Sequence, residues 1–241
     1  MVRRTEPQEE AMPATSTSSL VEKTFATVAG LRHGRAVHRH GLVCAGDATI
    51  EAEQLPLASG PTVVRISKGL GTPAGLPDLV GVALRLPTGD TDAVGEPRHW
   101  DLLLSGPVRR IGVVDVPTPT ATWNDLEVST ISPFAWNGEH WTVSARLLAP
   151  HVLGGLDLAS LADALQAGGG LSLEARQTDH RTPLGFVDLT RVGVDPDVAF
   201  DPVDTMPSGV EQVPAWLGSL RRNAYRGSRR GRPAPPTSRS A

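Results

Sequence analysis

Short apolar or alternating runs recur along the middle of the chain and predict a series of β-strands. Some runs alternate hydrophobic with polar positions and others are continuously apolar, the patterns of half-buried and fully buried strands. The segments between them are rich in Gly, Pro, Asp and Asn, which favour turns. We expect strands over 41–51, 63–67, 81–86, 101–104, 111–116, 126–131 and 141–147. This spacing is typical of an antiparallel barrel or sandwich.

A helical pattern follows these strands. Asp157 is a suitable N-cap, because its carboxylate can accept hydrogen bonds from the first free amides of a helix. The residues after it place an apolar stripe on one helix face, formed by Leu158, Leu161, Ala162 and Leu165. The glycines at 168–170 are expected to end this helix.

The remaining elements complete an α+β fold. Two more strands are expected over 171–176 and 185–192, and helices over 20–29 and 215–225. The segment 195–214 contains four prolines and is expected to run extended over the surface. The predicted fold class is therefore α+β, an antiparallel β-barrel with a few flanking helices.

The length and composition suit one globular domain. The chain has 241 residues, with 25 glycines and 21 prolines, which predicts many turns and short elements. Residues 1–17 are polar and are expected to form a disordered N-terminal arm. We expect a single barrel domain over 18–232 and a basic flexible tail over 233–241.

Charge and hydropathy exclude several classes of function. A net charge of −3 gives no overall field that attracts nucleic acid, and the basic tail has no aromatic residues to stack on bases. No apolar run approaches the roughly 20 residues of a membrane span, and the N-terminus lacks a secretory signal. The single cysteine, Cys44, excludes an internal disulfide. We expect a cytoplasmic protein without a membrane or nucleic-acid partner; the sequence leaves a homo-oligomer open.

Three segments carry candidate chemistry. Taken alone, the first could be a half-exposed basic strand, and Tyr225, the single tyrosine, could be an ordinary residue at a helix end. The segments are Arg-Ala-Val-His-Arg-His-Gly at 35–41; Val-Val-Arg-Ile-Ser at 63–67 with the strands at 77–86 and 100–102; and Met-Pro-Ser-Gly-Val-Glu at 206–211 followed by Arg221 and Tyr225.

Together the three segments resemble motifs of the catalase-like haem protein family. The first resembles the distal-histidine motif, which has an arginine three residues before the histidine and a glycine three after. The second resembles the V-R-F-S, D-P-x-G-x-A-x-x-F and W-D-L strands, in the same order. The third resembles the P-G-I-E segment and the R-x-x-x-Y helix. The resemblance covers roughly residues 30–105 and 198–232, and it implies a minimal barrel of the catalase-core type that binds haem b.

The resemblance assigns the iron ligand to Tyr225. A tyrosine phenolate is a known axial ligand of haem iron. A free phenol has a pKa near ~10, so ligation at neutral pH needs support, which ferric iron largely supplies. On a helix Arg221 lies one turn before Tyr225, where its guanidinium can favour the charged phenolate.

The resemblance also assigns residues to the opposite haem face and to the propionates. His38 would move a proton between the two oxygens of a hydroperoxide, as an imidazole near its working pKa can do. Ser67 would hydrogen-bond the His38 ring, and Val37 would line the entry channel. The propionates would pair with the guanidinium groups of Arg35, Arg65 and Arg232, which suit bidentate contacts with carboxylates.

One departure from the family pattern bears on the reaction. The family has an asparagine that helps to hold the peroxide where this chain has Ser105. Losing one well-placed donor costs about 10²–10³ in rate. Slower peroxidase chemistry on hydrogen peroxide or an organic hydroperoxide is therefore expected rather than efficient dismutation. Asp78 and Asp101 are expected to be structural.

Two alternative functions remain. A haem-binding protein with little or no turnover is favoured by Ser105. A metal-dependent hydrolase of the phosphodiesterase type would use imidazole and carboxylate ligands, although no complete ligand motif is present. Its candidate ligands are His33, His38, His40, His99 and Asp101.

Overall fold

The computed structural model describes residues 41–111, 114–178, 180–194 and 198–213, all of which belong to one compact unit. The expected N-terminal arm, the helices over 20–29 and 215–225 and the tail over 233–241 lie outside these residues. None of the helices in the described ranges is long and apolar enough to span a membrane.

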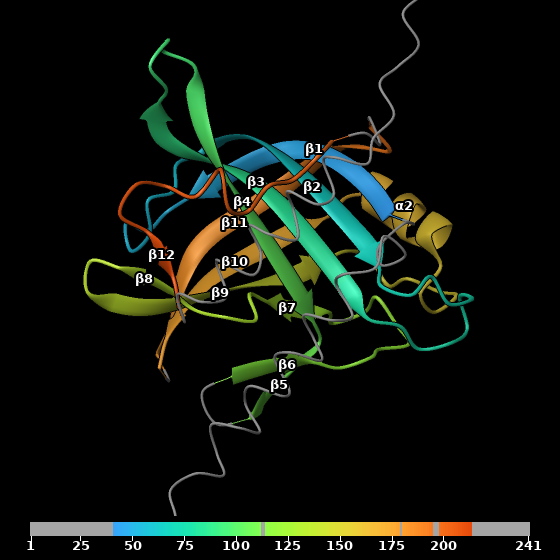
Figure 1. The fold of residues 1–241 in the computed structure, drawn as a ribbon. Coiled ribbons are helices and arrows are strands. Elements are labelled where there is room, and N and C mark those ends of the chain that lie inside the picture. Colours follow the sequence, from blue (N-terminus) through green and yellow to red (C-terminus); the bar gives the residue numbers. More distant parts are fainter. Residues whose placement is uncertain (1–40, 112–113, 179, 195–197, 214–241) are drawn as a thin grey trace, which may run out of the picture. The chain divides into compact units, whose positions relative to one another are not determined.

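Eight of the described strands close into an antiparallel barrel (Figure 1). Each pairs with the next, and the pairing of β9 with β10 joins the two ends of the sheet. In spatial order they are β10 (Gly170–Gln177), β11 (His180–Val192), β1 (Gly41–Ile50), β2 (Gly60–Lys68), β3 (Val80–Thr91), β4 (Pro97–Gly106), β7 (Glu127–Ser129) and β9 (Glu139–Leu148). The predicted antiparallel barrel is confirmed.

Alternate residues of each strand fill the barrel interior. On β2, Val64 and Ile66 point inward and are fully buried, whereas Val63 and Arg65, which alternate with them, lie on the outer wall. This is the period of two that the sequence shows in each run. Cys44 of β1 also lies inside, and burial raises the pKa of its thiol to about 11.

The predicted helix after Asp157 is confirmed as α2 (Leu158–Gln166). The Asp157 carboxylate accepts hydrogen bonds from the amide and hydroxyl of Ser160, both at 2.8 Å. These two bonds lower the pKa of Asp157. Leu161 and Leu165 carry the predicted apolar stripe into the core. Figure 1 shows α2 beside β1. The helix contacts both β1 and β11.

The single strand predicted over 111–116 is wrong. The chain instead forms a hairpin of β5 (Val108–Ile111) and β6 (Val114–Pro117), in which Ile111 pairs with Val114. The predicted strand joins the end of β5 to the start of β6, and the glycine at position 112 of the sequence was a turn signal that periodicity does not register.

Two short strands were not predicted. They are β8 (Phe134–Trp136) and β12 (Glu211–Gln212), which pair with each other, and β8 also pairs with β9. Asn137 and Gly138 connect β8 to β9 with φ values of 51° and 80°. Both residue types tolerate this left-handed backbone, so the Asn-Gly pair was a usable hairpin signal.

The proline-rich segment follows the barrel wall, as expected for 195–214. We call its described part, residues 198–213, the strap. Within the strap the only regular element is β12. The strap does not only lie on the surface of the barrel, because its residues Val210 and Gln212 are buried.

Candidate functional site

The outer wall of the barrel has one solvated side and one covered side. On β11 and the second half of β1 the outward side chains are exposed, among them Asp47, Thr49, Phe186 and Asp188. On β2, β3, β4 and β7 a row of small outward residues is buried instead. We call this the serine row: Ser67, Gly81, Ser105 and Ser129, each directly paired with the next.

The serine row brings together two residues that the sequence assigned to the reaction. Ser67 and Ser105 are 3% and 5% exposed. They lie two strand spacings apart, about 10 Å, on the same face of the wall. The Ser67 hydroxyl donates to the carbonyl of Gly81 at 3.2 Å, and the Ser105 hydroxyl donates to the carbonyl of Val80 at 3.1 Å.

These bonds decide what each serine can offer. A carbonyl oxygen only accepts, so in each of these two bonds the serine hydroxyl is the donor. The Ser105 hydroxyl oxygen can in addition accept a hydrogen bond. Ser105 therefore differs from the family's asparagine in chemistry as well as in length, because an amide group brings donor protons.

Arg65 lies on the same wall, next to the serine row. It is half-buried, and burial lowers the pKa of its guanidinium. Gly41 pairs with Ser67, and a Cβ atom at Gly41 would stand 2.8 Å from both Cζ and Nη2 of Arg65. Gly41, from the first sequence motif, thus leaves space for the side chain of Arg65, from the second.

The other assigned residues cannot be placed. His38, three positions before Gly41, lies outside the described residues. The same holds for five further predicted site residues: Arg35, Val37, Arg221, Tyr225 and Arg232. For these residues the assignments stay predictions.

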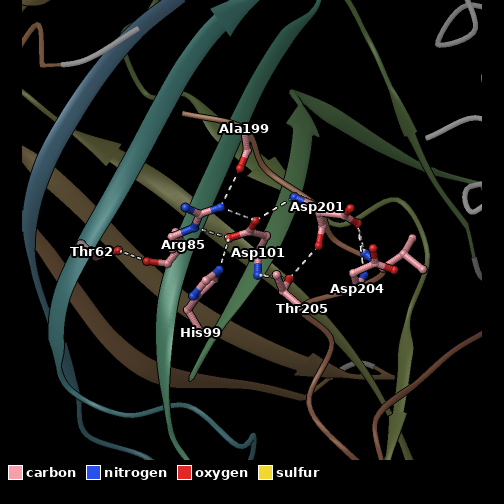
Figure 2. A network of polar contacts seen from close by, with 9 residues as sticks. Thr62, Arg85, His99, Asp101, Ala199, Asp201, Asp204 and Thr205 are labelled. Carbon is pink, nitrogen blue, oxygen red and sulfur yellow. Dashed lines mark hydrogen bonds and ion pairs between the residues drawn. The ribbon is translucent and has the colours of Figure 1, made fainter. Parts of the chain in front are cut away.

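A second polar cluster on the covered side ties the strap to the barrel. Figure 2 shows Arg85 of β3 and Asp101 of β4 side by side, with the strap alongside them. Arg85 donates from Nε to Oδ1 and from Nη2 to Oδ2 of Asp101, both at 2.8 Å. The hydrogen bond to Asp101 raises the pKa of Arg85. Arg85 also donates to the carbonyl of Ala199 at 2.6 Å and lies 5.3 Å from the centre of the Phe200 ring.

Asp101 is the centre of this cluster and is fully buried. Its Oδ2 also accepts from the amide of Asp201 at 2.7 Å, and its own amide donates to the Thr205 hydroxyl at 2.9 Å (Figure 2). The Thr205 hydroxyl in turn donates to the carbonyl of Asp201 at 2.7 Å. Asp101 is structural, as expected, and it joins two strands to the strap.

Asp78 is structural as well. Its carboxylate accepts from the amides of Leu70, Thr72 and Leu79 at 2.7–2.9 Å and so shapes the loop between β2 and β3. Burial works to raise the pKa of Asp78, but these hydrogen bonds outweigh it and the pKa is lowered.

The described residues do not support a metal-dependent hydrolase. Within them no group of three His, Cys, Asp or Glu side chains could hold a metal ion. His99 Nε2 lies 3.8 Å from Asp101 Oδ1, but both carboxylate oxygens are already bonded, and Arg85 beside them repels a cation. Burial and then Arg85 lower the pKa of His99. His33, His38 and His40 lie outside the described residues.

Sequence reasoning missed one charged group on the covered side. Asp115 of β6 forms an ion pair with Arg176 of β10, and it accepts from the Ser129 hydroxyl at 3.2 Å. A signal existed, because Asp115 interrupts an apolar run. Periodicity predicts a single strand over this run, and a single strand gives Asp115 no partner.

The comparisons with known proteins agree on the fold. Three catalases superpose on the chain with high probability. A bacterial catalase has 14% identity and a TM-score of 0.54 over 92% of this chain and 62% of that one. Catalase A from Saccharomyces cerevisiae has 11% identity and a TM-score of 0.55, over 95% of this chain and 67% of that one. A fungal catalase has 13% identity and a TM-score of 0.57, over 98% of this chain and 66% of that one.

At these identities the likeness shows the fold alone: this chain has a catalase-like β-barrel. It spans between 62% and 67% of the length of those catalases. Neither the protein-family models nor the curated proteins yield a match to this sequence.

Proposed function

We propose that this chain is a haem-dependent peroxidase or catalase-like protein that reacts with hydrogen peroxide or organic hydroperoxides. The observation that carries the proposal is the covered side of the barrel. There Arg65, Ser67 and Ser105, which match positions around the haem in the family, lie on one buried face with Gly41 making room for Arg65. The catalase-like fold supports the same function.

The covered wall suits a flat cofactor. Along the serine row the outward side chains are small, and the Arg65 guanidinium would suit a propionate carboxylate. Ferric haem would supply the iron that binds a hydroperoxide and allows its O–O bond to break. Tyr225 would hold that iron, with Arg221 stabilising the phenolate. Arg35 and Arg232 would pair with propionates beside Arg65.

The bonding of Ser67 would favour one tautomer of His38. Because the Ser67 hydroxyl can donate to the carbonyl of Gly81, a His38 ring beside it would meet the hydroxyl oxygen as an acceptor. A His38 ring that bonds to Ser67 must therefore point an N–H toward it and present its bare nitrogen to the substrate. That nitrogen is the one that takes a proton from the near oxygen of a hydroperoxide and returns it to the leaving oxygen.

The first test is an absorption spectrum of the purified protein after reconstitution with haem. A stoichiometric Soret band near about 400 nm is expected for bound haem. A haem carrier with little turnover is the second candidate, favoured by Ser105, whose hydroxyl donates to a backbone carbonyl. Measurement of oxygen evolution and dye oxidation on the haem-loaded protein distinguishes the two.

Replacing His38 with alanine should leave haem bound while the rate of reaction with hydroperoxide falls by at least about a hundredfold. The imidazole moves the proton but holds no part of the cofactor, so the Soret band should keep its intensity. Stopped-flow mixing with peroxide measures the rate. His140→Ala, an exposed histidine on β9, is the control, and an unchanged rate for His38→Ala would assign proton transfer to another group.

Replacing Gly41 with alanine should weaken haem binding about tenfold and lower the free energy of unfolding by less than ~1 kcal/mol. The new Cβ would displace the end of the Arg65 side chain, which is flexible, and would stand 3.0 Å from the backbone carbonyl oxygen of Ile66, so the barrel has to shift only slightly. Gly75→Ala is a matched control, because a Cβ at Gly75 meets nothing within 4 Å. Equal haem affinity for the two variants would remove Arg65 from the propionate site.

A further inference from the structure

The last described residues of the strap are fixed to the barrel through β8. β12 pairs with β8 so that Gln212 lies opposite Phe134 (Figure 1). Phe134 in turn packs edge-on against Trp100 of the barrel core, with the ring centres 4.9 Å apart. One residue after β12, the amide of Val213 donates to the carbonyl of Pro133 at 3.0 Å. The backbone at the end of the strap is therefore held by a strand that itself packs on the core.

A buried side-chain hydrogen bond fixes the register of this short pairing. Nε2 of Gln212 donates to the hydroxyl of Ser132 at 2.8 Å, and the two residues are 6% and 1% exposed. Oε1 of Gln212 has no partner, so this is the one bond that the amide group makes among the described residues. A strand of two residues has too few backbone bonds to select its own register, whereas a buried polar pair is satisfied in one register alone. Gln212 therefore specifies where the strap ends on the barrel.

The contacts just before β12 depend on the same register. Gly209 has a φ of 84°, and a Cβ atom at this position would stand 3.0 Å from Cζ3 of the Trp136 ring on β8. Val210 is 7% exposed and belongs to the hydrophobic core. A shift of the strap by one residue would bring a side chain against the Trp136 ring and turn Val210 away from the core.

The sequence continues from this anchor to the residue that the resemblance assigns to the iron. Only Pro214 separates Val213 from the helix expected over 215–225, and Tyr225 is the last residue of that range. A proline restricts its own φ to a narrow range, and a helix carries a displacement at one end to the other. A slip of β12 by one residue, about 3.4 Å, would therefore move the Tyr225 phenol by a similar distance.

We propose that Gln212 is a positioning residue for the iron ligand: its hydrogen bond to Ser132 fixes the register of β12 and so sets the place of the Tyr225 phenolate. This inference rests on the proposed function. Gln212 acts through Tyr225 and not through a contact with the cofactor.

The test is the release of haem from the reconstituted ferric protein to an excess of apomyoglobin, followed at the Soret band. Gln212→Ala should release haem about ten times faster than the wild type, which is the lower end of the range for groups that orient a metal ligand. Its electron paramagnetic resonance spectrum should contain more than one high-spin species, because the phenolate no longer has a single position. Ser132→Ala removes the other partner and should give the same two results, and the double variant should add nothing to either.

Asn124→Ala is the matched control. Asn124 also holds a loop with a side-chain amide, which bonds to the amide and the carbonyl of Val152 at 2.8 and 3.0 Å. This loop follows the end of β9, whereas β8 pairs with the start of β9. The control variant should change the rate of haem release by less than about twofold and leave the resonance spectrum as it is in the wild type.

Two results would overturn the inference. One is a rate of haem release for Gln212→Ala equal to that of the control. The other is faster release with an unchanged resonance spectrum, which would make Gln212 a structural residue. If Gln212→Ala does not fold, Ser132→Ala is judged by the same two measurements. Wild-type protein without a Soret band would instead refute the proposed function, and full haem retention by Tyr225→Phe would remove the residue through which Gln212 acts.

Discussion

Replacing Asp101 with alanine is expected to lower the free energy of unfolding by about 3 kcal/mol. The change leaves the Arg85 guanidinium without its bidentate partner on a buried wall, and it leaves the amide of Asp201 without an acceptor. Arg85 is 28% exposed, so water relieves part of the penalty, and the value lies at the lower end of the range for broken buried pairs.

Thermal and urea unfolding followed by circular dichroism measure this effect. For a domain of this size the expected loss corresponds to a fall in Tm of roughly 10 °C. Asp188→Ala on the solvated side of the barrel is the matched control, with an expected change below about 0.5 kcal/mol. If both variants unfold alike, Asp101 does not anchor the strap.

Replacing Tyr225 with phenylalanine should abolish stoichiometric haem binding. Phenylalanine has the same ring but no oxygen to coordinate iron, so only apolar contacts and the propionate pairs would remain. The Soret absorbance per protein after removal of free haem measures the loss, and far-UV circular dichroism should stay that of the wild type.

The control for this variant is Arg226→Ala, which changes the neighbouring residue and leaves the phenol intact. It should bind haem in full. Full haem retention by Tyr225→Phe would refute the assignment of the iron ligand, and with it the mechanism proposed here. A loss of haem together with the loss of the circular dichroism signal would instead assign Tyr225 to the fold.

The barrel strands could be predicted because burial imposes a simple period on them. Residues 63–67 alternate, and the structure places Val64 and Ile66 inside and Arg65 outside. The observed strand β2 is longer at both ends, since backbone pairing continues past the residues whose side chains reveal the alternation. The helix after Asp157 was predictable for a similar reason, because its cap and its apolar stripe agree.

The elements that were missed are those whose partners lie far away in the sequence. β12 is two residues long and exists only because it pairs with β8, which no local pattern encodes. The hairpin of β5 and β6 depends on a reversal within one apolar run. As a result, its Asp115 could not be connected with Arg176, although the two form an ion pair across 61 positions.

The candidate site was predictable in part. Arg65 and Ser67 are two residues apart, so the sequence already predicts that they share one face of a strand. The resemblance to the family added Ser105 to the same site. The direction of the serine protons could not be predicted, because it depends on which β3 carbonyl each hydroxyl meets. The Arg85–Asp101 pair was also missed, although opposite charges on two successive apolar strands were a usable signal.

The location of Cys44 inside the barrel has a consequence for a protein that meets oxidants. Sulfur reacts with hydroperoxides mainly as the thiolate, which at a pKa of about 11 amounts to roughly one molecule in ten thousand at neutral pH. The side chain is also fully enclosed by its neighbours. The chain therefore keeps its one sulfhydryl in a form that resists sulfenic acid formation, and repeated exposure to its own proposed substrate should not inactivate it by that route.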